Sequence, residues 1–159
     1  MERKLKAGLF SFTGDEGCVI TFLEILNYKL KDWNGRVEWQ AARVLRKKSS
    51  LEGLDVAFVE GAISNEKELE KLMEIRKNAK KVVAIGTCAI NGSPSNHRNS
   101  FDEDKKREIK HILKRFNHMP SVEPIGKYVK VDAEVPGCPI IEQKFVEVME
   151  QYIKEFGVE

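Results

Sequence analysis

The sequence predicts an α/β fold, a flavodoxin-like parallel sheet with helices on both faces. Strand-like segments alternate with amphipathic helical segments along the chain. Several of the strand-like segments are continuous apolar runs, which is the pattern of strands buried on both faces of a sheet. Parallel neighbours need long crossover connections, and the intervening helices supply them. No internal repeat or long linker interrupts this alternation, so we expect residues 1–159 to form one domain.

The chain begins with a strand, a short loop and a helix. Residues 4–12 are apolar enough for a first strand, and residues 19–30 carry apolar side chains spaced for a largely buried helix. Between them, the loop 13–17 leads into Cys18 at the start of that helix. Because open α/β folds bind ligands outside the carboxyl ends of their strands, we expect Cys18 at a ligand-binding edge.

The middle of the chain continues the alternation. We expect a weaker strand at residues 37–42 and a polar loop or short helix at 43–50. A buried strand at 54–59, a helix at 64–78 and another buried strand at 82–87 should follow. Ser64 or Asn65 is positioned to cap the helix, since acidic residues follow in its first turn. The last of these strands leads directly into Cys88.

The last third is more polar. We expect a loop at 89–99, a charged helix from Asp102 to Phe116, a connector punctuated by Pro120 and Pro124, a strand at 128–132 and a final helix at 140–156. Apolar residues spaced along one face should anchor the charged helix to the core: Ile109, Ile112, Leu113 and Phe116.

Composition excludes several classes of function. The chain has 27 basic and 25 acidic residues, so bulk charge gives no reason to expect a nucleic acid or an acidic membrane as partner. No apolar run approaches the ~20 residues of a membrane span, and the first residues lack the apolar core of a signal peptide. Three cysteines cannot all pair within one chain, so we expect reduced thiols in a cytoplasmic protein.

All three cysteines follow a predicted strand. Cys18, Cys88 and Cys138 should therefore converge at one edge if these strands are parallel. Soft sulfur donors suit zinc or an iron–sulfur cluster. Spacing alone leaves another interpretation open, in which each cysteine is a small buried apolar residue at a strand end.

The local motifs favour the cluster. Gly17-Cys18 before an apolar helix, Gly86-Thr-Cys-Ala89 with Gly92 after it, and Pro136-Gly-Cys-Pro139 together resemble the small, electron-transferring subunit of NiFe hydrogenases and its relative in complex I. The resemblance covers essentially the whole chain. It is strongest to short cytoplasmic forms, such as the small subunit of NAD(P)-linked hydrogenases and the delta subunit of archaeal sulfhydrogenase.

This resemblance implies a non-catalytic electron-transfer subunit that carries one proximal 4Fe–4S cluster. The NiFe site would belong to a separate large subunit, and a flavin to a flavin- or cluster-bearing partner, so the chain alone should show no turnover. No further cysteine follows the last helix, so we expect no medial or distal cluster.

One position departs from the family pattern. Its C-x-G-C motif reads Asp15-Glu-Gly-Cys18 here, which places a carboxylate where the first cysteine ligand would stand. The resemblance therefore implies Cys18, Cys88 and Cys138 as ligands, with Asp15 as a hard oxygen donor in the fourth position. Glu16, a water on an open iron, or a degraded site without a cluster are the alternatives.

Other functions remain open at the level of sequence. A complex I-like module that passes electrons toward quinone, a flavodoxin-like flavin carrier and a cluster-free assembly protein would share this fold. Two acids in the loop 13–17 would repel the phosphate of a flavin. We expect His97, His111 and His118 to face solvent, and Glu60 to serve in helix capping or at an interface.

Overall fold

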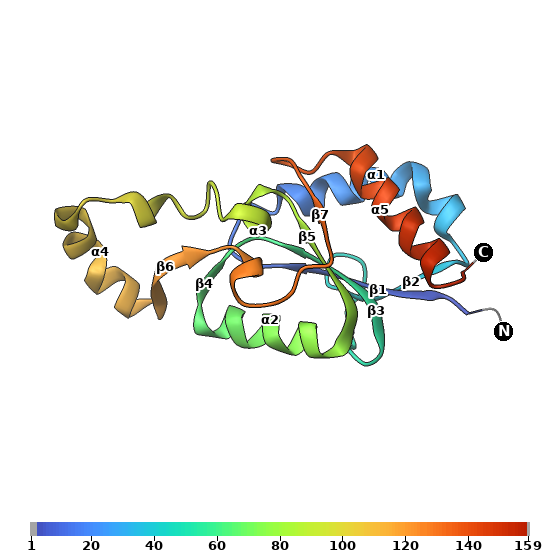
Figure 1. Cartoon of the computed structure of the whole chain (residues 1–159), viewed down its shortest axis with the longest axis horizontal. Helices are drawn as coiled ribbons and strands as arrows, with labels where there is room; N and C mark the ends of the chain where they lie inside the picture. Colours follow the sequence, from blue (N-terminus) through green and yellow to red (C-terminus); the bar gives the residue numbers. More distant parts are fainter. Residues whose placement is uncertain (1–2, 159) are drawn as a thin grey trace.

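The computed structural model describes residues 3–158 and contains a five-stranded parallel sheet. The strands are β1 (Leu5–Ser11), β2 (Val37–Ala42), β3 (Leu54–Glu60), β5 (Ala79–Ile85) and β7 (Ala133–Val135). Their spatial order is β2-β1-β3-β5-β7, which is the flavodoxin-like order when the sheet strands are counted along the chain. The predicted fold class is therefore confirmed (Figure 1).

Helices cover the two faces of this sheet. The helices α1 (Gly17–Trp33) and α5 (Glu142–Glu155) lie side by side on one face, and α2 (Glu66–Asn78) lies on the other (Figure 1). All seven residues of β3 are buried, as the continuous apolar run predicts for a central parallel strand. Alternate residues of β3 enter opposite cores: Phe58 packs toward α1 and α5, and Val59 packs toward α2.

The connector predicted around Pro120 is a strand, so that prediction was wrong. Strand β6 (His118–Glu123) pairs antiparallel with the short β4 (Ile63–Asn65) and forms a separate two-stranded sheet. Both strands are edges, and an edge strand tolerates a proline because one side of its backbone needs no partner. His118, expected to face solvent, is consequently a half-buried strand residue.

The strand before Cys138 lies later in the sequence than predicted. Residues 128–132 are irregular and follow the short 3-10 helix Ile125–Lys127, and β7 begins at Ala133. Val129 N–H donates to the Ile125 carbonyl (3.1 Å), so these two apolar residues are buried by a turn rather than by a strand. The loop expected at 89–99 likewise contains the helix α3 (Thr87–Asn91) and the 3-10 helix His97–Ser100.

Helix α4 (Glu103–Arg115) has the predicted cap but not the predicted anchor. Asp102 accepts a hydrogen bond from Lys105 N–H (2.8 Å), yet no residue of the helix is buried. Ile112 is 44% exposed and Phe116 is 60% exposed. Ile109 and Leu113 are half-buried, and the helix packs against β6. Together α4 and β6 project away from the main sheet (Figure 1).

Two smaller expectations have clear outcomes. Asn65, rather than Ser64, caps α2 and accepts a hydrogen bond from Glu68 N–H (3.0 Å). Residues 43–50 form a loop and not a helix. Among residues 3–158, no helix has the length and apolar character needed to cross a membrane.

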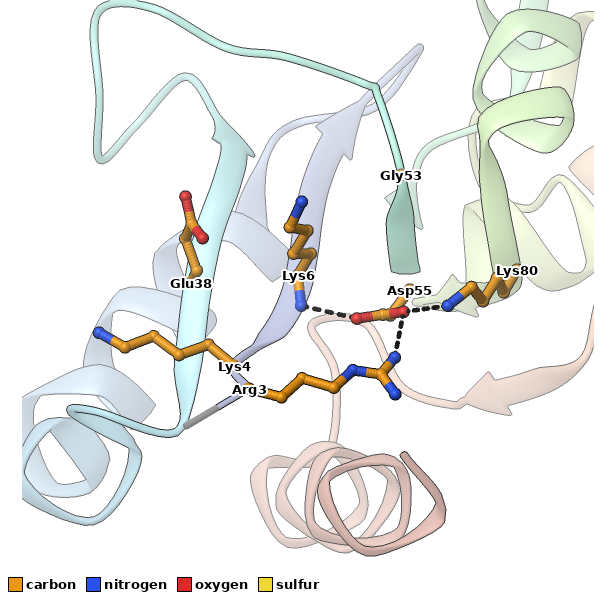
Figure 2. A pocket seen from close by; sticks show the side chains of 7 residues that line it. All are labelled: Arg3, Lys4, Lys6, Glu38, Gly53, Asp55 and Lys80. Atoms are coloured by element: carbon orange, nitrogen blue, oxygen red, sulfur yellow. Dashed lines mark hydrogen bonds and ion pairs between the residues drawn. The ribbon is translucent and has the colours of Figure 1, made fainter. Parts of the chain in front are cut away.

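A buried carboxylate ties together the amino ends of three strands. Asp55, at the start of β3, accepts hydrogen bonds from the β1 backbone N–H of Lys6 (3.0 Å), from Arg3 (3.0 Å) and from Lys80 (2.7 Å) (Figure 2). Burial alone would raise the pKa of Asp55, but these hydrogen bonds and the two cations outweigh burial and lower it. The ionised carboxylate is therefore the form that the folded state stabilises.

We expect Asp55→Asn to lower the free energy of unfolding by about 1–3 kcal/mol at pH 7. The depressed folded-state pKa makes a contribution that is fully present above the unfolded-state pKa near 4 and is lost as the pH falls through the folded-state value. Urea denaturation should therefore show a difference between the two proteins that shrinks below about pH 4. Glu38 is exposed and lines the same pocket as Asp55. Glu38→Gln is therefore the control, and it should change the free energy of unfolding little.

Candidate functional site

The three cysteines line one pocket at the carboxyl edge of the sheet. Cys18 lies in the first turn of α1, Cys88 lies in α3 after β5, and Cys138 lies in the turn after β7. Asp15 and Glu60 line the same pocket. The structure thus brings Asp15 and the three cysteines, the four candidate ligands, to one pocket. Cys18 is buried, Cys88 is half-buried and Cys138 is exposed, so the site opens to the surface on the Cys138 side.

Backbone hydrogen bonds hold two of the cysteine segments against each other. Gly86 N–H donates to the Val135 carbonyl (2.8 Å), while the backbone N–H and the hydroxyl of Thr87 both donate to the Gly137 carbonyl (2.9 and 3.0 Å). The segment that begins α3 is therefore fastened to the turn after β7. These hydrogen bonds place Cys88 and Cys138 at the same pocket, and no direct contact between the two side chains is needed.

Glycine at position 86 leaves the space that the Cys18 sulfur occupies. Gly86 has φ +81°, a conformation that side chains rarely adopt, and a Cβ built there would lie 2.5 Å from Cys18 Sγ. Gly137 has φ +120°, and a Cβ there would collide with the Pro139 carbonyl oxygen. Steric crowding thus explains why glycine stands at positions 86 and 137, since a side chain at either position would collide with its neighbours.

Glu60 supports Cys18 from the end of β3. Its Oε1 accepts a hydrogen bond from Cys18 N–H (3.1 Å), which satisfies one of the free N–H groups in the first turn of α1. Its Oε2 is buried without a hydrogen-bond partner between residues 3 and 158. Burial raises the pKa of Glu60; the Cys18 hydrogen bond opposes this shift, and the charges of Asp15 and Glu16 add to it. The helix-capping role expected for Glu60 is confirmed.

Cys18 is the buried cysteine of the three. Burial, followed by the nearby Glu60 carboxylate, raises the pKa of Cys18 to about 12. The charges of Cys138 and Cys88 raise it further, whereas a backbone hydrogen bond from Ile140 opposes the shift. A metal that bound the thiolate would have to displace this proton, so metal binding at Cys18 would release a proton at neutral pH.

Asp15 and Glu16 face different surroundings. Asp15 Oδ1 accepts a hydrogen bond from Gly17 N–H (2.9 Å), which stabilises the loop before α1. Among the described residues, no hydrogen bond engages the other carboxylate oxygen of Asp15. Glu16, at φ 60°, lines a separate pocket beside β1 and β2. The geometry therefore favours Asp15 over Glu16 as a donor toward the cysteines.

Two further side chains, Ser95 and Thr87, shape the site. Ser95 donates a hydrogen bond to Cys88 Sγ (3.2 Å), and Thr87 fastens the α3 segment to the turn after β7. Neither residue has a chemical signature that marks it in the sequence. His97 is exposed, packs edge-on against Phe101 and does not line the pocket.

The donor set fits an iron–sulfur cluster better than a single ion. Three soft sulfur donors and the Asp15 carboxylate line a pocket that also has glycines in its wall. The buried Oε2 of Glu60, in the same wall, has no hydrogen-bond partner among the described residues. From residue 3 to residue 158, no three His, Cys, Asp or Glu side chains are grouped closely enough for one metal ion.

Comparisons with known proteins identify relatives of this chain. The family model described as "NADH ubiquinone oxidoreductase, 20 Kd subunit" matches residues 16–152. A subunit of the F420-non-reducing hydrogenase of Methanothermobacter marburgensis is 30% identical, with 100% of this chain and 56% of that protein covered. The delta subunit of sulfhydrogenase 2 of Pyrococcus furiosus is 31% identical, with 91% and 60% covered.

A solved structure supports the fold. A chain in the crystal structure of an NAD+-reducing [NiFe]-hydrogenase in the H2-reduced state superposes with a TM-score of 0.81 at 24% identity, covering 99% of this chain and 95% of that one. The present chain spans little more than half the length of the two relatives named above. By the match over residues 16–152, the chain belongs to the family of the 20 kDa subunit of NADH ubiquinone oxidoreductase, and its relatives include subunits of hydrogenases.

Proposed function

We propose that the chain binds one 4Fe–4S cluster through Cys18, Cys88 and Cys138, with Asp15 in the fourth position. The observation that carries this proposal is that all four residues line a single pocket. A cluster of this kind, when bound, accepts and releases single electrons. The chain's own contribution is to hold the thiolates, to keep water from the Cys18 side and to set the polarity around the sulfurs.

The opening of the site indicates where a redox partner would dock. Cys138 is exposed while Cys18 is buried, so a redox partner would approach over the loops at the carboxyl edge of the sheet. We propose that a separate large subunit with a NiFe site docks there, and that electrons continue to a flavin- or cluster-bearing subunit in the cytoplasm. In this role the chain activates no hydrogen itself. Such an interface would belong to the large permanent class, above about 2,000 Å² in total.

A quinone-linked module is the second candidate. The matched family model is described by a subunit of NADH ubiquinone oxidoreductase, which favours a chain that passes electrons toward quinone. The relatives named as hydrogenase subunits favour the first candidate. A flavodoxin-like flavin carrier is less favoured, because Asp15 and Glu16 would repel a flavin phosphate at this edge.

Anaerobic co-purification from the native cells tests the partner. A tagged chain should recover a large subunit that contains nickel, together with iron in excess of one cluster. Recovery of quinone-reducing subunits without nickel would favour the second candidate. A stable, monodisperse monomer with an intact cluster and no affinity for either partner would contradict the relay role.

The fourth ligand is tested at Asp15. We expect Asp15→Ala to make about one iron in four exchangeable and to convert the cluster toward a three-iron form on oxidation, since no donor would remain at that corner. Asp15→Cys should retain the iron but change the electron paramagnetic resonance (EPR) signal and the midpoint potential, because sulfur is a softer donor than oxygen.

Two further variants separate ligation from loop stabilisation. Asp15→Asn keeps an acceptor for Gly17 N–H but removes the anionic donor, so it should behave like Asp15→Ala. Glu16→Ala is the neighbouring control and should match the unaltered protein. If Asp15→Ala and Asp15→Asn both keep the native iron content, EPR signal and potential, Asp15 is not a ligand.

A further inference from the structure

The sulfur of Cys88 accepts a hydrogen bond from a serine seven residues later. Ser95 Oγ lies 3.2 Å from Cys88 Sγ, within reach of an O–H···S hydrogen bond. Ser95 is half-buried. Within residues 3–158 this is the only side-chain hydroxyl that bonds to a cysteine sulfur.

The intervening loop holds Ser95 in this position. Gly92 N–H donates to the Cys88 carbonyl (2.9 Å), and Asn96 N–H donates to the Gly92 carbonyl (2.8 Å). Ser93 N–H donates to Asn91 Oδ1 (2.9 Å). Gly92 has φ +86°, and a Cβ built there would lie 2.8 Å from Asn96 Nδ2, so the turn closes tightly. The hydroxyl is thus placed by a chain of backbone bonds that begins at Cys88 itself.

The three cysteines consequently have different polar surroundings. Cys18 has a carboxylate, Glu60, bonded to its backbone N–H, whereas Cys88 has a neutral hydroxyl aimed at its sulfur. Cys138 is exposed and makes neither contact. A hydroxyl dipole that points at a thiolate stabilises negative charge on that sulfur.

We propose that Ser95 is a positioning residue that raises the reduction potential of the site through the Cys88 sulfur. Hydrogen bonds to cluster sulfurs are one of the means by which proteins set cluster potentials. The reduced site carries one more negative charge than the oxidised site. The Ser95 hydrogen bond therefore stabilises the reduced form more strongly, and its removal should favour the oxidised form. This inference rests on the proposed cluster-binding function.

The test is a redox titration of the full chain, reconstituted anaerobically with iron and sulfide. In Ser95→Ala, the midpoint potential should shift to a more negative value, with the iron and sulfide content unchanged. At a fixed applied potential we expect the ratio of reduced to oxidised sites to fall up to about tenfold, which corresponds to about 59 mV for a one-electron couple. Electron–nuclear double resonance of the reduced site should also lose one proton coupling that exchanges in D2O.

Matched variants isolate the hydroxyl. Ser95→Thr keeps the donor and should retain the native potential, whereas Ser95→Val has nearly the shape of threonine without the donor and should match Ser95→Ala. Ser93→Ala alters an exposed hydroxyl of the same loop and should change nothing. If Ser95→Ala does not retain its iron, the difference in midpoint potential between Ser95→Thr and Ser95→Val decides the question.

Equal potentials in Ser95→Thr and Ser95→Val would overturn the inference, as would an equal shift in Ser93→Ala. Failure of the proposed function looks different, because the unaltered chain would then take up no iron at all. Retention of four iron atoms with an unmoved potential in the Ser95 variants would overturn only the role of Ser95.

Discussion

Replacing Cys88 with alanine is expected to reduce the iron content of the reconstituted chain from about four atoms to less than one. A thiolate that binds one corner of a cluster cannot be replaced by a methyl group, and no other cysteine exists in the chain besides Cys18 and Cys138. The same loss is expected for alanine at either of those positions. Iron and acid-labile sulfide are measured after anaerobic desalting.

Cys138→Ala distinguishes ligand loss from unfolding. Cys138 is exposed, so its removal should change the free energy of unfolding of the cluster-free chain by no more than about 0.5 kcal/mol. Cys18 is buried and its removal leaves a small cavity, so Cys18→Ala should also cost about 1 kcal/mol of stability. Iron loss in Cys138→Ala with unchanged stability would assign the effect to ligation. Full iron retention in all three variants would contradict the site.

Gly86→Ala is expected to have the next largest effect. The backbone conformation at position 86 (φ 81°, ψ 159°) is one that glycine adopts with ease, and a side chain there costs about 1–3 kcal/mol. The added Cβ would also lie 2.5 Å from Cys18 Sγ, in the middle of the site. We expect a loss of about 3 kcal/mol or more in the free energy of unfolding, together with loss of the cluster.

Gly35→Ala is the matched control for this substitution. Gly35 has a similar φ of +91°, but a Cβ built there meets nothing within 4 Å. Gly35→Ala should therefore lower the free energy of unfolding only through backbone strain, by about 1 kcal/mol, and leave iron binding intact. Urea denaturation and iron analysis of both variants separate backbone strain from the clash with Cys18. If Gly86→Ala holds iron as well as Gly35→Ala does, Gly86 has no part in shaping the pocket.

The buried centre of the fold was predictable because its pattern is local. The apolar run at 54–59 and the cysteines that follow the strands β5 and β7 indicate central parallel strands and their carboxyl edge. The position of β7 was less predictable. Val129 and Asp132 have the alternation of a strand, but Val129 is buried by a turn and Asp132 accepts hydrogen bonds from Val82 N–H (2.8 Å) and Arg76 (2.7 Å).

Features that depend on distant contacts could not be read from the sequence. Helix α4 has an apolar side, and it is the path of the chain, which carries α4 and β6 away from the main sheet, that leaves this side only partly buried (Figure 1). The strand β6 depends on its pairing with β4, more than 50 residues earlier. At the site, the cysteine motifs indicated the proposed ligands, but the approach of Gly86 to Cys18 and of Glu60 to Cys18 N–H joins separate strands and loops.

The most direct measurement is the iron and sulfide content of the unaltered chain after anaerobic reconstitution, combined with Mössbauer spectroscopy. Three cysteines and Asp15 around one pocket predict about four iron and four sulfide per chain, with one iron distinguishable by its oxygen ligand. A brown protein with that stoichiometry would support the account. A colourless protein without iron, or a yellow protein with one flavin per chain, would contradict it.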